Sequence, residues 1–240
     1  FKVGLFDESG TLRGLGRVAV EPQSPGPERF ELPVPVFWER LRRGLDEALN
    51  QAGATADAIA GISYSSQANT LVLLANDGLP LTPLIFWHDQ RAAPVDDDLA
   101  AFGRTEEHGR VTGLVGVTPG RASVKCRWFA HHQPEIWART RWIMTISDYL
   151  THALTDLRLG DASTAVLTGL YSLPGRDWWP AALATFGIDG AQLSRPLTPG
   201  RAIGVTGASA RTWLGLPAGI PYAVGALDHH AAALGSGLGA

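Results

Sequence analysis

An acidic residue stands directly after a short apolar segment near the end of the chain, where it could take part in acid–base chemistry. The segment from Tyr222 to Leu227 lies between Pro221 and Asp228, a pattern typical of a buried strand. Residues 229–234 can then form a helix. A carboxylate at a strand end faces the crevice in which open α/β sheets bind ligands. Asp228 is therefore a candidate general base, and the alternative is a simple helix N-cap.

Two other predicted strands also end in side chains that can bind a ligand. The first is followed by Gln67 and Asn69, and the second by Trp87, Asp89 and Arg91. Polar groups and a flat ring of this kind can orient a molecule with several hydroxyl groups. Each residue also has a structural alternative: turn formation for the two amides, core packing for the tryptophan and a surface ion pair for the last two.

Composition excludes several classes of protein. The 240 residues carry a net charge of −3, with 45% hydrophobic and 18% charged residues, as expected for an ordinary globular chain of one large domain. This charge provides no basic surface for nucleic acid and no polybasic membrane signal. No apolar run approaches the roughly 20 residues that span a bilayer. The single cysteine, Cys126, excludes an internal disulfide and fits a reducing cytoplasm.

Hydrophobic spacing predicts the elements that must position these groups. Residues 2–6 and 14–20 flank a turn cluster and predict a β-hairpin. Apolar residues at helical spacing predict an amphipathic helix over 36–52 that ends at Gly53. The remaining predictions are strands at 59–64, 71–74, 84–87 and 222–227, and helices at 143–154, 179–186, 208–214 and 229–234.

Several acidic and histidine residues could suggest metal binding or catalysis, but their local sequence patterns favour structural roles. The run 96–98 holds three aspartates after a proline, which suits a helix N-terminus better than a calcium loop. Asp148 and Asp161 are predicted to be caps or structural hydrogen-bonding groups. His131 and His132 are neighbours and face apart on a helix, so they do not predict a metal site.

Several stretches resemble one known family. Residues 225–237 read Gly-x-x-Asp-x-x-Ala-Ala-x-x-Gly-x-Gly and follow Gly-Leu-Pro-x-Gly-x-Pro at 215–221. Residues 120–129 read Gly-x-x-x-x-Lys-x-Arg-Trp-Phe, which includes Lys125 and Trp128. With the two polar loops, these patterns resemble the N-terminal domain of the FGGY carbohydrate kinases, which include glycerol, xylulose and ribulose kinases. Ala122 and Cys126 depart from the family pattern.

The resemblance implies one ribonuclease H-like, actin-like ATPase domain over residues 1–240, an α/β fold with a mixed sheet and flanking helices. It also implies ATP-dependent phosphorylation of a sugar or polyol, with Asp228 taking the proton from the hydroxyl group. The residues implied to bind the sugar are Gln67, Asn69, Trp87, Asp89, Arg91 and His229. We further expect a cytoplasmic enzyme that could form a homodimer, and no metal ligands within the chain itself.

Parts of such kinases are expected to lie outside this sequence. The resemblance places an Asp-x-Gly-Thr phosphate-binding turn directly before the hairpin and a nucleotide-binding domain after residue 240. ATP and Mg²⁺ would be bound largely by those parts. The chain is therefore expected to be the sugar-binding half of the kinase and to be inactive alone.

The sugar loops differ from those of named family members. Glycerol kinases carry Arg and Glu at the positions of Ala68 and Asn69 and Tyr at the position of Gly120, whereas xylulose kinases place Met and His at the first two. Smaller, uncharged residues at these positions leave more volume in the pocket. We therefore expect a pentose- to heptose-sized ketose or polyol as substrate, with Asn69 and His229 bonding the extra hydroxyls.

Two alternatives to a kinase remain open from the sequence. One is a sugar-binding or assembly module of the same fold without catalysis. The other begins with the triplet Asp228-His229-His230, which is also the signature of a family of metal-dependent phosphoesterases. That family needs further aspartates on neighbouring strand ends to hold two metal ions, and Asp89 and Asp148 are the candidates.

Overall fold

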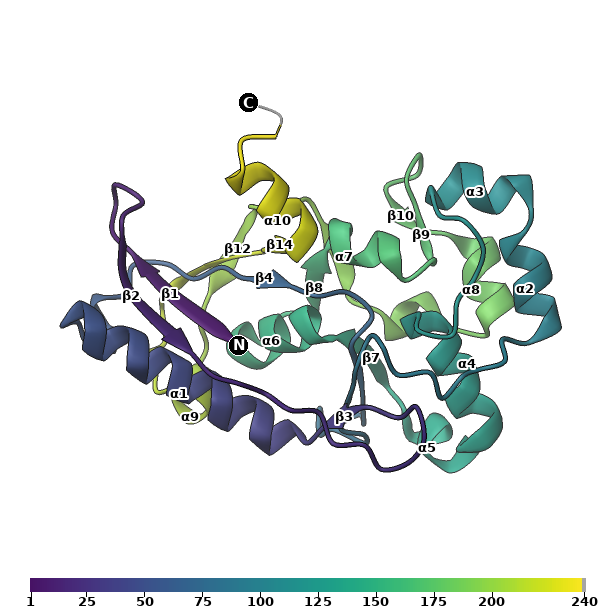
Figure 1. The fold of residues 1–240 in the computed structure, drawn as a ribbon, viewed down its shortest axis with the longest axis horizontal. Helices are drawn as coiled ribbons and strands as arrows, with labels where there is room; N and C mark the ends of the chain where they lie inside the picture. Colours follow the sequence, from purple (N-terminus) through teal and green to yellow (C-terminus); the bar gives the residue numbers. More distant parts are fainter. Residues whose placement is uncertain (239–240) are drawn as a thin grey trace.

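The computed structural model describes residues 1–238 and has an α/β fold, with helices around a central set of strands (Figure 1). The chain begins with an antiparallel hairpin of β1 (Lys2–Phe6) and β2 (Leu12–Arg17), as predicted. Asp7 shapes its turn, because Asp7 Oδ1 accepts hydrogen bonds from the backbone N–H groups of Ser9 (2.9 Å) and Thr11 (3.1 Å).

The long helix α1 (Val34–Ala52) lies along this hairpin (Figure 1). It ends at Gly53, which adopts the left-handed conformation with φ of 61°. The contact with the hairpin depends on small residues, since a Cβ on Gly16 would lie 1.8 Å from the carbonyl oxygen of Gly44 in the helix. The predicted helix is confirmed, although it begins earlier, after Pro33.

A four-stranded antiparallel sheet in the order β3-β6-β5-β7 separates two hydrophobic cores. Its strands are β3 (Glu31–Leu32), β6 (Leu84–Ile85), β5 (Leu71–Leu74) and β7 (Trp142–Thr145). Alternate side chains of β5 point to opposite faces, so Val72 and Leu74 join one core while Leu71 and Leu73 join the other. All four are fully buried. The continuous apolar run of β5 therefore reflects burial on both faces.

Helices cover the two faces of this sheet. The first core is closed by α1, α6 (Ile146–Thr155) and α9 (Ser209–Leu214). The second core is closed by α2 (Asp97–Gly103), α4 (Ala122–His132) and α8 (Pro180–Phe186), which Figure 1 draws on the right. The remaining helices are α3 (Glu106–Thr112), α5 (Pro134–Arg139), α7 (Ala162–Leu167) and α10 (Asp228–Gly235), and short 3-10 turns cover Ala56–Ala58 and Gly190–Gln192.

Short strand pairs complete the fold. Two pairs are parallel: β4 (Ser65–Ser66) with β14 (Ala226–Leu227), and β8 (Leu159–Asp161) with β11 (Arg195–Leu197). Two others are antiparallel: β9 (Tyr171–Ser172) with β10 (Asp177–Trp178), and β12 (Ala202–Val205) with β13 (Pro221–Ala223). The β4–β14 pair matters most, because it joins segments that are distant in the sequence.

Three predicted elements differ from the structure. The predicted strand 59–64 is only an extended segment with a bridge at Ile62, and the regular pairing starts at Ser65. The predicted helix 143–154 begins at Ile146, because the preceding residues complete the sheet as β7. The predicted strand 222–227 is divided into β13 and β14. Gly225 interrupts it, and a Cβ there would lie 1.8 Å from the carbonyl oxygen of Tyr64.

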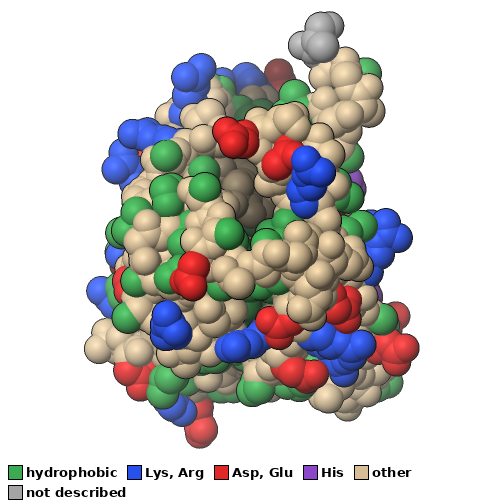
Figure 2. Space-filling view, turned by 90° about the vertical axis from the view of Figure 1, so that its left-hand side faces the viewer, with side chains coloured by type: hydrophobic (Ala, Val, Ile, Leu, Met, Phe, Trp, Pro, Cys, Tyr) green, Lys and Arg blue, Asp and Glu red, His purple; other side chains and the backbone are tan. Residues whose placement is uncertain are grey.

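The surface agrees with the weak net charge. Figure 2 shows that positive, negative and hydrophobic side chains are interspersed on one face, which is hollowed in its upper part. Mixed charge of this kind gives no extended basic field on that face for a nucleic acid. Among residues 1–238, no helix combines the length and the apolar character needed to cross a membrane.

Candidate functional site

The parallel pairing of β4 with β14 brings two predicted site residues to one edge. Ala226 pairs with Ser65 and Leu227 pairs with Ser66, so the next residues on the two strands are Asp228 and Gln67. Parallel strands present their carboxyl ends at the same edge of a sheet, where ligands of α/β folds bind. The two side chains therefore start from adjacent backbone positions, a neighbour relation that the sequence analysis did not predict.

Asp228 has a carboxylate that is free to react. It is the first residue of α10, its side chain is 48% exposed, and Leu227 occupies the N-cap position without a side-chain capping bond. Asp228 Oδ1 accepts only a local hydrogen bond from the N–H of His229 (2.8 Å). The alternative that Asp228 is a simple N-cap is wrong. A helix N-terminus favours negative charge, which suits a carboxylate that acts as a base.

His229 is placed further into solvent. Its side chain is 84% exposed, and its Nε2 lies 3.9 Å from Asp228 Oδ1. This separation is too long for a hydrogen bond between them. The ring is therefore available to a ligand that approaches the start of α10.

The loop after β4 is held by its own side chains. Gln67 Nε2 donates to Thr70 Oγ1 (2.7 Å), and the same oxygen accepts from the backbone N–H of Trp87 (3.1 Å), so Thr70 joins the two predicted sugar loops. Asn69 has φ of 60° and uses its side-chain Oδ1 to accept from Ala122 N–H at the start of α4 (3.1 Å). Its amide hydrogens are the groups that remain for a ligand.

Trp87 is an exposed aromatic residue. Its side chain is 53% exposed, which rules out the alternative that it packs in the core. Gly120 lies close to its backbone, since a Cβ on Gly120 would be 2.8 Å from the Trp87 carbonyl oxygen. An exposed indole beside hydrogen-bonding loops can stack on the apolar face of a sugar ring.

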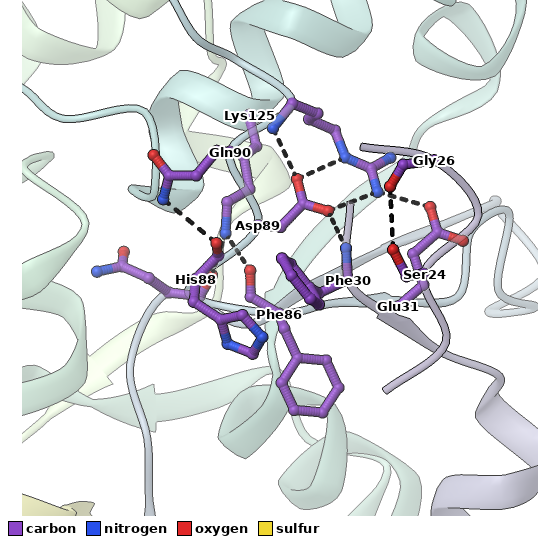
Figure 3. A network of polar contacts seen from close by, with 11 residues as sticks. Ser24, Gly26, Phe30, Glu31, Phe86, His88, Asp89, Gln90 and Lys125 are labelled. Carbon is purple, nitrogen blue, oxygen red and sulfur yellow. Dashed lines mark hydrogen bonds and ion pairs between the residues drawn. The ribbon is translucent and has the colours of Figure 1, made fainter. Parts of the chain in front are cut away.

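Asp89 and Arg91 are buried, which corrects the surface ion-pair alternative and gives their predicted contact with a sugar no support. Figure 3 shows Asp89 enclosed among Phe30, Glu31 and Lys125. Side-chain exposure is 0% for Asp89 and 3% for Arg91. The guanidinium donates from Nε to Asp89 Oδ1 (2.8 Å) and from Nη2 to Oδ2 (2.9 Å), in a bidentate arrangement. Their hydrogen bonds are made to each other and to neighbouring residues, so both side chains hold the loop that carries Trp87.

The buried pair receives further hydrogen bonds that make it stable inside the protein. Phe30 N–H donates to Asp89 Oδ2 (2.7 Å), and Arg91 Nη2 also donates to Glu31 Oε1 (2.6 Å). Burial alone would raise the pKa of Asp89, but the hydrogen bonds from Arg91 and Phe30 outweigh it and lower the pKa below its ordinary value. Asp89 is therefore ionised at neutral pH, and the loop is tied to β3.

Metal binding does not fit the arrangement of these acids. Within residues 1–238, no three His, Cys, Asp or Glu side chains are grouped so that they could hold a metal ion. Asp89 is bonded to Arg91, and Asp148 is buried at the start of α6. The two-metal phosphoesterase alternative is therefore wrong for the part of the chain that the structure describes.

Comparison with known proteins identifies the family. The profile described as "FGGY family of carbohydrate kinases, N-terminal domain" matches residues 1–235. The chain belongs to the FGGY family. It is 31% identical over 243 residues to an autoinducer-2 kinase of Escherichia coli (strain SMS-3-5 / SECEC), covering 98% of this chain and 44% of that protein. It is 32% identical over 203 residues to a xylulose kinase of Streptomyces rubiginosus, covering 84% of this chain and 41% of that protein.

A solved structure supports the same conclusion for the fold. The xylulose kinase from Rhodospirillum rubrum superimposes with a TM-score of 0.88 at 27% identity, over 98% of this chain and 48% of that one. The predicted ribonuclease H-like, actin-like fold is confirmed. The chain spans less than half the length of the curated relatives it matches.

Lys125 holds two loops of this FGGY domain in position. The sequence analysis did not predict which groups it contacts. It projects from α4, is fully buried, and donates from Nζ to the carbonyl oxygens of Phe86 (2.6 Å) and Asn69 (3.0 Å). It therefore fastens both sugar loops to one helix. Burial lowers the pKa of Lys125 to about 7, although nearby Asp89 opposes the shift. In the sequence, the only indication of a role for Lys125 was its place in the family pattern at 120–129.

A second buried cluster lies near the candidate site, at the starts of α6 and α7. Asp148 and Thr145 form a reciprocal capping box at the start of α6, and Asp161 caps α7 by accepting from Thr164 N–H (2.6 Å). Both aspartates are structural groups, as the sequence predicted. Burial, with a further contribution from the Asp161 charge, raises the pKa of Asp148 to about 7. The capping network thus contains one carboxyl that is neutral in mildly acidic solution.

The sign of this shift gives a testable pH dependence. The ordinary pKa of Asp148 is 3.8 and the folded value is about 7, so the folded state retains a proton that the unfolded state has lost between those values. The protonated Asp148 carboxyl makes its full contribution to folding stability below about pH 4, and this contribution is lost as the pH rises to about 7. We expect the stability of Asp148→Asn relative to wild type to increase by up to about 3 kcal/mol between pH 5 and pH 8.

Urea unfolding of wild type and Asp148→Asn at pH 5 and at pH 8 measures this difference in stability. Asp46→Asn, the same change at an exposed position on α1, is the control and should leave the pH dependence unaltered. An equal difference between Asp148→Asn and wild type at both pH values would contradict the shift.

The hollow with the most space for a ligand among those described lies away from the ends of β4 and β14. This hollow of about 230 Å³ is lined partly by Asp96, Arg127, Trp128 and His131, and it shares only Arg91 with the predicted site. The candidate site is instead an open edge formed by the ends of β4 and β14 and by the loop that carries Trp87. An open edge suits a ligand that is enclosed only when another domain closes over it.

Proposed function

We propose that this chain is the sugar-binding half of an ATP-dependent carbohydrate kinase and that Asp228 is its general base. The observation that carries the proposal is the β4–β14 register, in which a half-exposed, uncapped Asp228 stands beside Gln67. A base must have an accessible carboxylate within reach of the hydroxyl that it deprotonates. Gln67, Asn69, Trp87 and His229 surround that position with hydrogen-bonding groups and an aromatic face.

The proposed reaction is phosphoryl transfer to a sugar hydroxyl. The hydroxyl oxygen attacks the γ-phosphorus of ATP, the bond from that phosphorus to the bridging oxygen breaks, and ADP leaves with the electron pair. Asp228 accepts the hydroxyl proton as the new oxygen–phosphorus bond forms. The protein's main task in such a reaction is positioning, which the joined loops of Thr70 and Lys125 support.

Nucleotide and Mg²⁺ binding require residues other than those described. Residues 1–238 contain no metal-ligating cluster, and the sequence contains no Gly-x-x-x-x-Gly-Lys-Ser/Thr loop. We therefore assign this chain no step that passes through the metal ion. The chain covers less than half of its relatives' length, so we propose that the rest of the complete kinase supplies the phosphate contacts. The isolated chain should accordingly bind sugar without turnover.

We propose a pentose- to heptose-sized ketose or polyol as the substrate. Ala68, Asn69 and Gly120 are small and uncharged at positions where glycerol kinases carry Arg, Glu and Tyr. A tyrosine at Gly120 would clash, because even a Cβ there would approach the Trp87 carbonyl oxygen to 2.8 Å. Larger substrates can use the remaining space and pair the amide hydrogens of Asn69.

A panel of C3 to C7 polyols and ketoses tests this proposal. With the complete kinase, we expect glycerol to have a kcat/KM lower than the best C5–C7 substrate by about 10²–10⁴-fold, because it leaves polar groups of the site unpaired. Calorimetry on the isolated chain should rank the sugar affinities in the same order. An assay of the isolated chain with ATP and sugar should show no ADP formation. Glycerol as the best substrate would overturn the size argument, and steady turnover by the isolated chain would overturn the division of roles.

A further inference from the structure

A buried carboxylate lies behind the two strands that carry Asp228 and Gln67. Asp161 is 1% exposed and accepts three hydrogen bonds. Its Oδ1 accepts from Ser163 Oγ (2.6 Å) and Thr164 N–H (2.6 Å), and its Oδ2 accepts from the Tyr64 hydroxyl (3.2 Å). The Thr164 bond caps α7, but the other two lead away from that helix. They connect Asp161 to both strands of the catalytic edge.

The first connection runs through Ser163 to β14. Because Ser163 gives its proton to Asp161, its oxygen is left to accept, and it does so from the backbone N–H of Leu227 (2.9 Å). Leu227 is the residue directly before Asp228 and is 3% exposed. The charged acceptor orients and strengthens this chain of hydrogen bonds. The backbone at the catalytic end of β14 is therefore fixed by a side chain that is 64 residues away.

The second connection runs through Tyr64 to β4. Burial raises the pKa of the Tyr64 hydroxyl, so it keeps its proton and donates to Asp161. Tyr64 directly precedes β4, and its carbonyl oxygen accepts from Ala226 N–H (3.3 Å) in β14. Successive N–H groups of β14 thus bond to opposite sides, Ala226 to Tyr64 and Leu227 to Ser163. A two-residue strand is held on both sides by groups that meet at Asp161.

We propose that Tyr64, Asp161 and Ser163 form a strand clamp whose function is to position the carboxylate of Asp228 against Gln67 and the bound sugar hydroxyl. This inference rests on the proposed function and adds positioning residues to it. None of the three touches the ligand edge directly, and each acts through the backbone of β4 or β14. Displacing a reacting group by about 1 Å can reduce turnover by about 10²-fold.

Ser163→Ala is the central test, because it removes the hydroxyl that accepts from Leu227 N–H and donates to Asp161, and so breaks the connection between them. In the complete kinase, we expect kcat to fall by about 10–10²-fold with KM changed less than about threefold, since sugar-binding groups remain in place. Ser163→Thr keeps the hydroxyl and should restore most of kcat. Tyr64→Phe removes the longer bond to Asp161 and is a milder second variant should Ser163→Ala fold poorly.

Thr206 offers a matched control in the same part of the fold. It is 2% exposed, its Oγ1 donates to the carbonyl oxygen of Pro217 (2.9 Å), and that oxygen accepts from the buried N–H of Ile220 (3.0 Å). Thr206→Val therefore removes the same kind of hydrogen bond, but ahead of β13 and away from Asp228. It should lower stability as much as Ser163→Ala while leaving kcat within about twofold of wild type.

Amide hydrogen exchange provides a readout that does not depend on turnover. We expect the Leu227 amide to exchange at least about tenfold faster in Ser163→Ala than in wild type, with no such change in Thr206→Val. Unchanged exchange at Leu227, wild-type kcat in Ser163→Ala, or an equal loss of kcat in Thr206→Val would each overturn the clamp. Asp228→Asn tests the proposed function separately: retained turnover there would remove the general base, while amide exchange would still decide the clamp.

Discussion

Replacing Asp228 with Asn should reduce the turnover of the complete kinase by about 10²–10⁴-fold, the range that general acid–base catalysis contributes. Asn keeps the size of the side chain and its hydrogen-bonding oxygen but cannot accept the proton of the sugar hydroxyl. Sugar affinity should change little, because Gln67, Asn69 and Trp87 are unaltered. Initial rates of ADP formation, with calorimetric measurement of sugar binding, check both parts of the expectation.

We expect Asp228→Asn to change catalysis without changing the stability of the fold. Asp228 forms no capping bond and is 48% exposed, so its replacement should change the free energy of unfolding by less than about 0.5 kcal/mol. Asp46→Asn is again the control and should retain wild-type turnover. Turnover of Asp228→Asn within a few-fold of wild type would exclude a general base at this position. Sugar binding by a complete protein with no turnover in wild type would favour the non-catalytic binding module.

Local sequence patterns predicted some of the elements that form the candidate site. An apolar run followed by an acid predicted that Asp228 ends a strand, and the same argument predicted the position of Gln67. Both predictions succeed because hydrophobic periodicity and turn residues act within a few residues along the chain. The hairpin and α1 are correct for the same reason. The pairing of β4 with β14 was not predicted, because no local signal in the sequence encodes which strands lie side by side.

Long-range contacts explain what the sequence could not predict. Asp89 and Arg91 were interpreted as sugar ligands because they follow an apolar run, yet their partners Phe30 and Glu31 lie about 60 residues earlier in the chain. Burial of a polar side chain depends on what packs over it, and nothing in the spacing of 87–91 encodes the presence of β3. The strand clamp of Tyr64, Asp161 and Ser163 could not be predicted for the same reason, since Ser163 contacts Leu227, 64 residues later in the chain.

Removing the Arg91 side chain should destabilise the domain by about 3–5 kcal/mol, because Asp89 would be left as a buried and unpaired charge. Arg91→Met keeps much of the length of the side chain but removes both guanidinium hydrogen bonds to the carboxylate, leaving only those from the backbone N–H groups of Phe30 and Arg91. Urea unfolding measures the loss. Arg13→Met is the matched control, since Arg13 is 63% exposed in its ion pair with Asp7 and should contribute less than about 1 kcal/mol.

The pH dependence and a double variant identify the cause of that loss. The pKa of Asp89 is lowered in the folded protein, so the pair stabilises the fold above the unfolded pKa of about 3.9, and this stability is lost as pH falls through the folded value. The difference in unfolding free energy between wild type and Arg91→Met should therefore narrow as the pH falls below about 4. Asp89→Asn combined with Arg91→Met should recover part of the stability at neutral pH, because residue 89 no longer carries a buried, unpaired negative charge. If the double variant were less stable than Arg91→Met alone, packing of the arginine stem against Trp128 and Phe129 would be the main contribution, and not the charge pair.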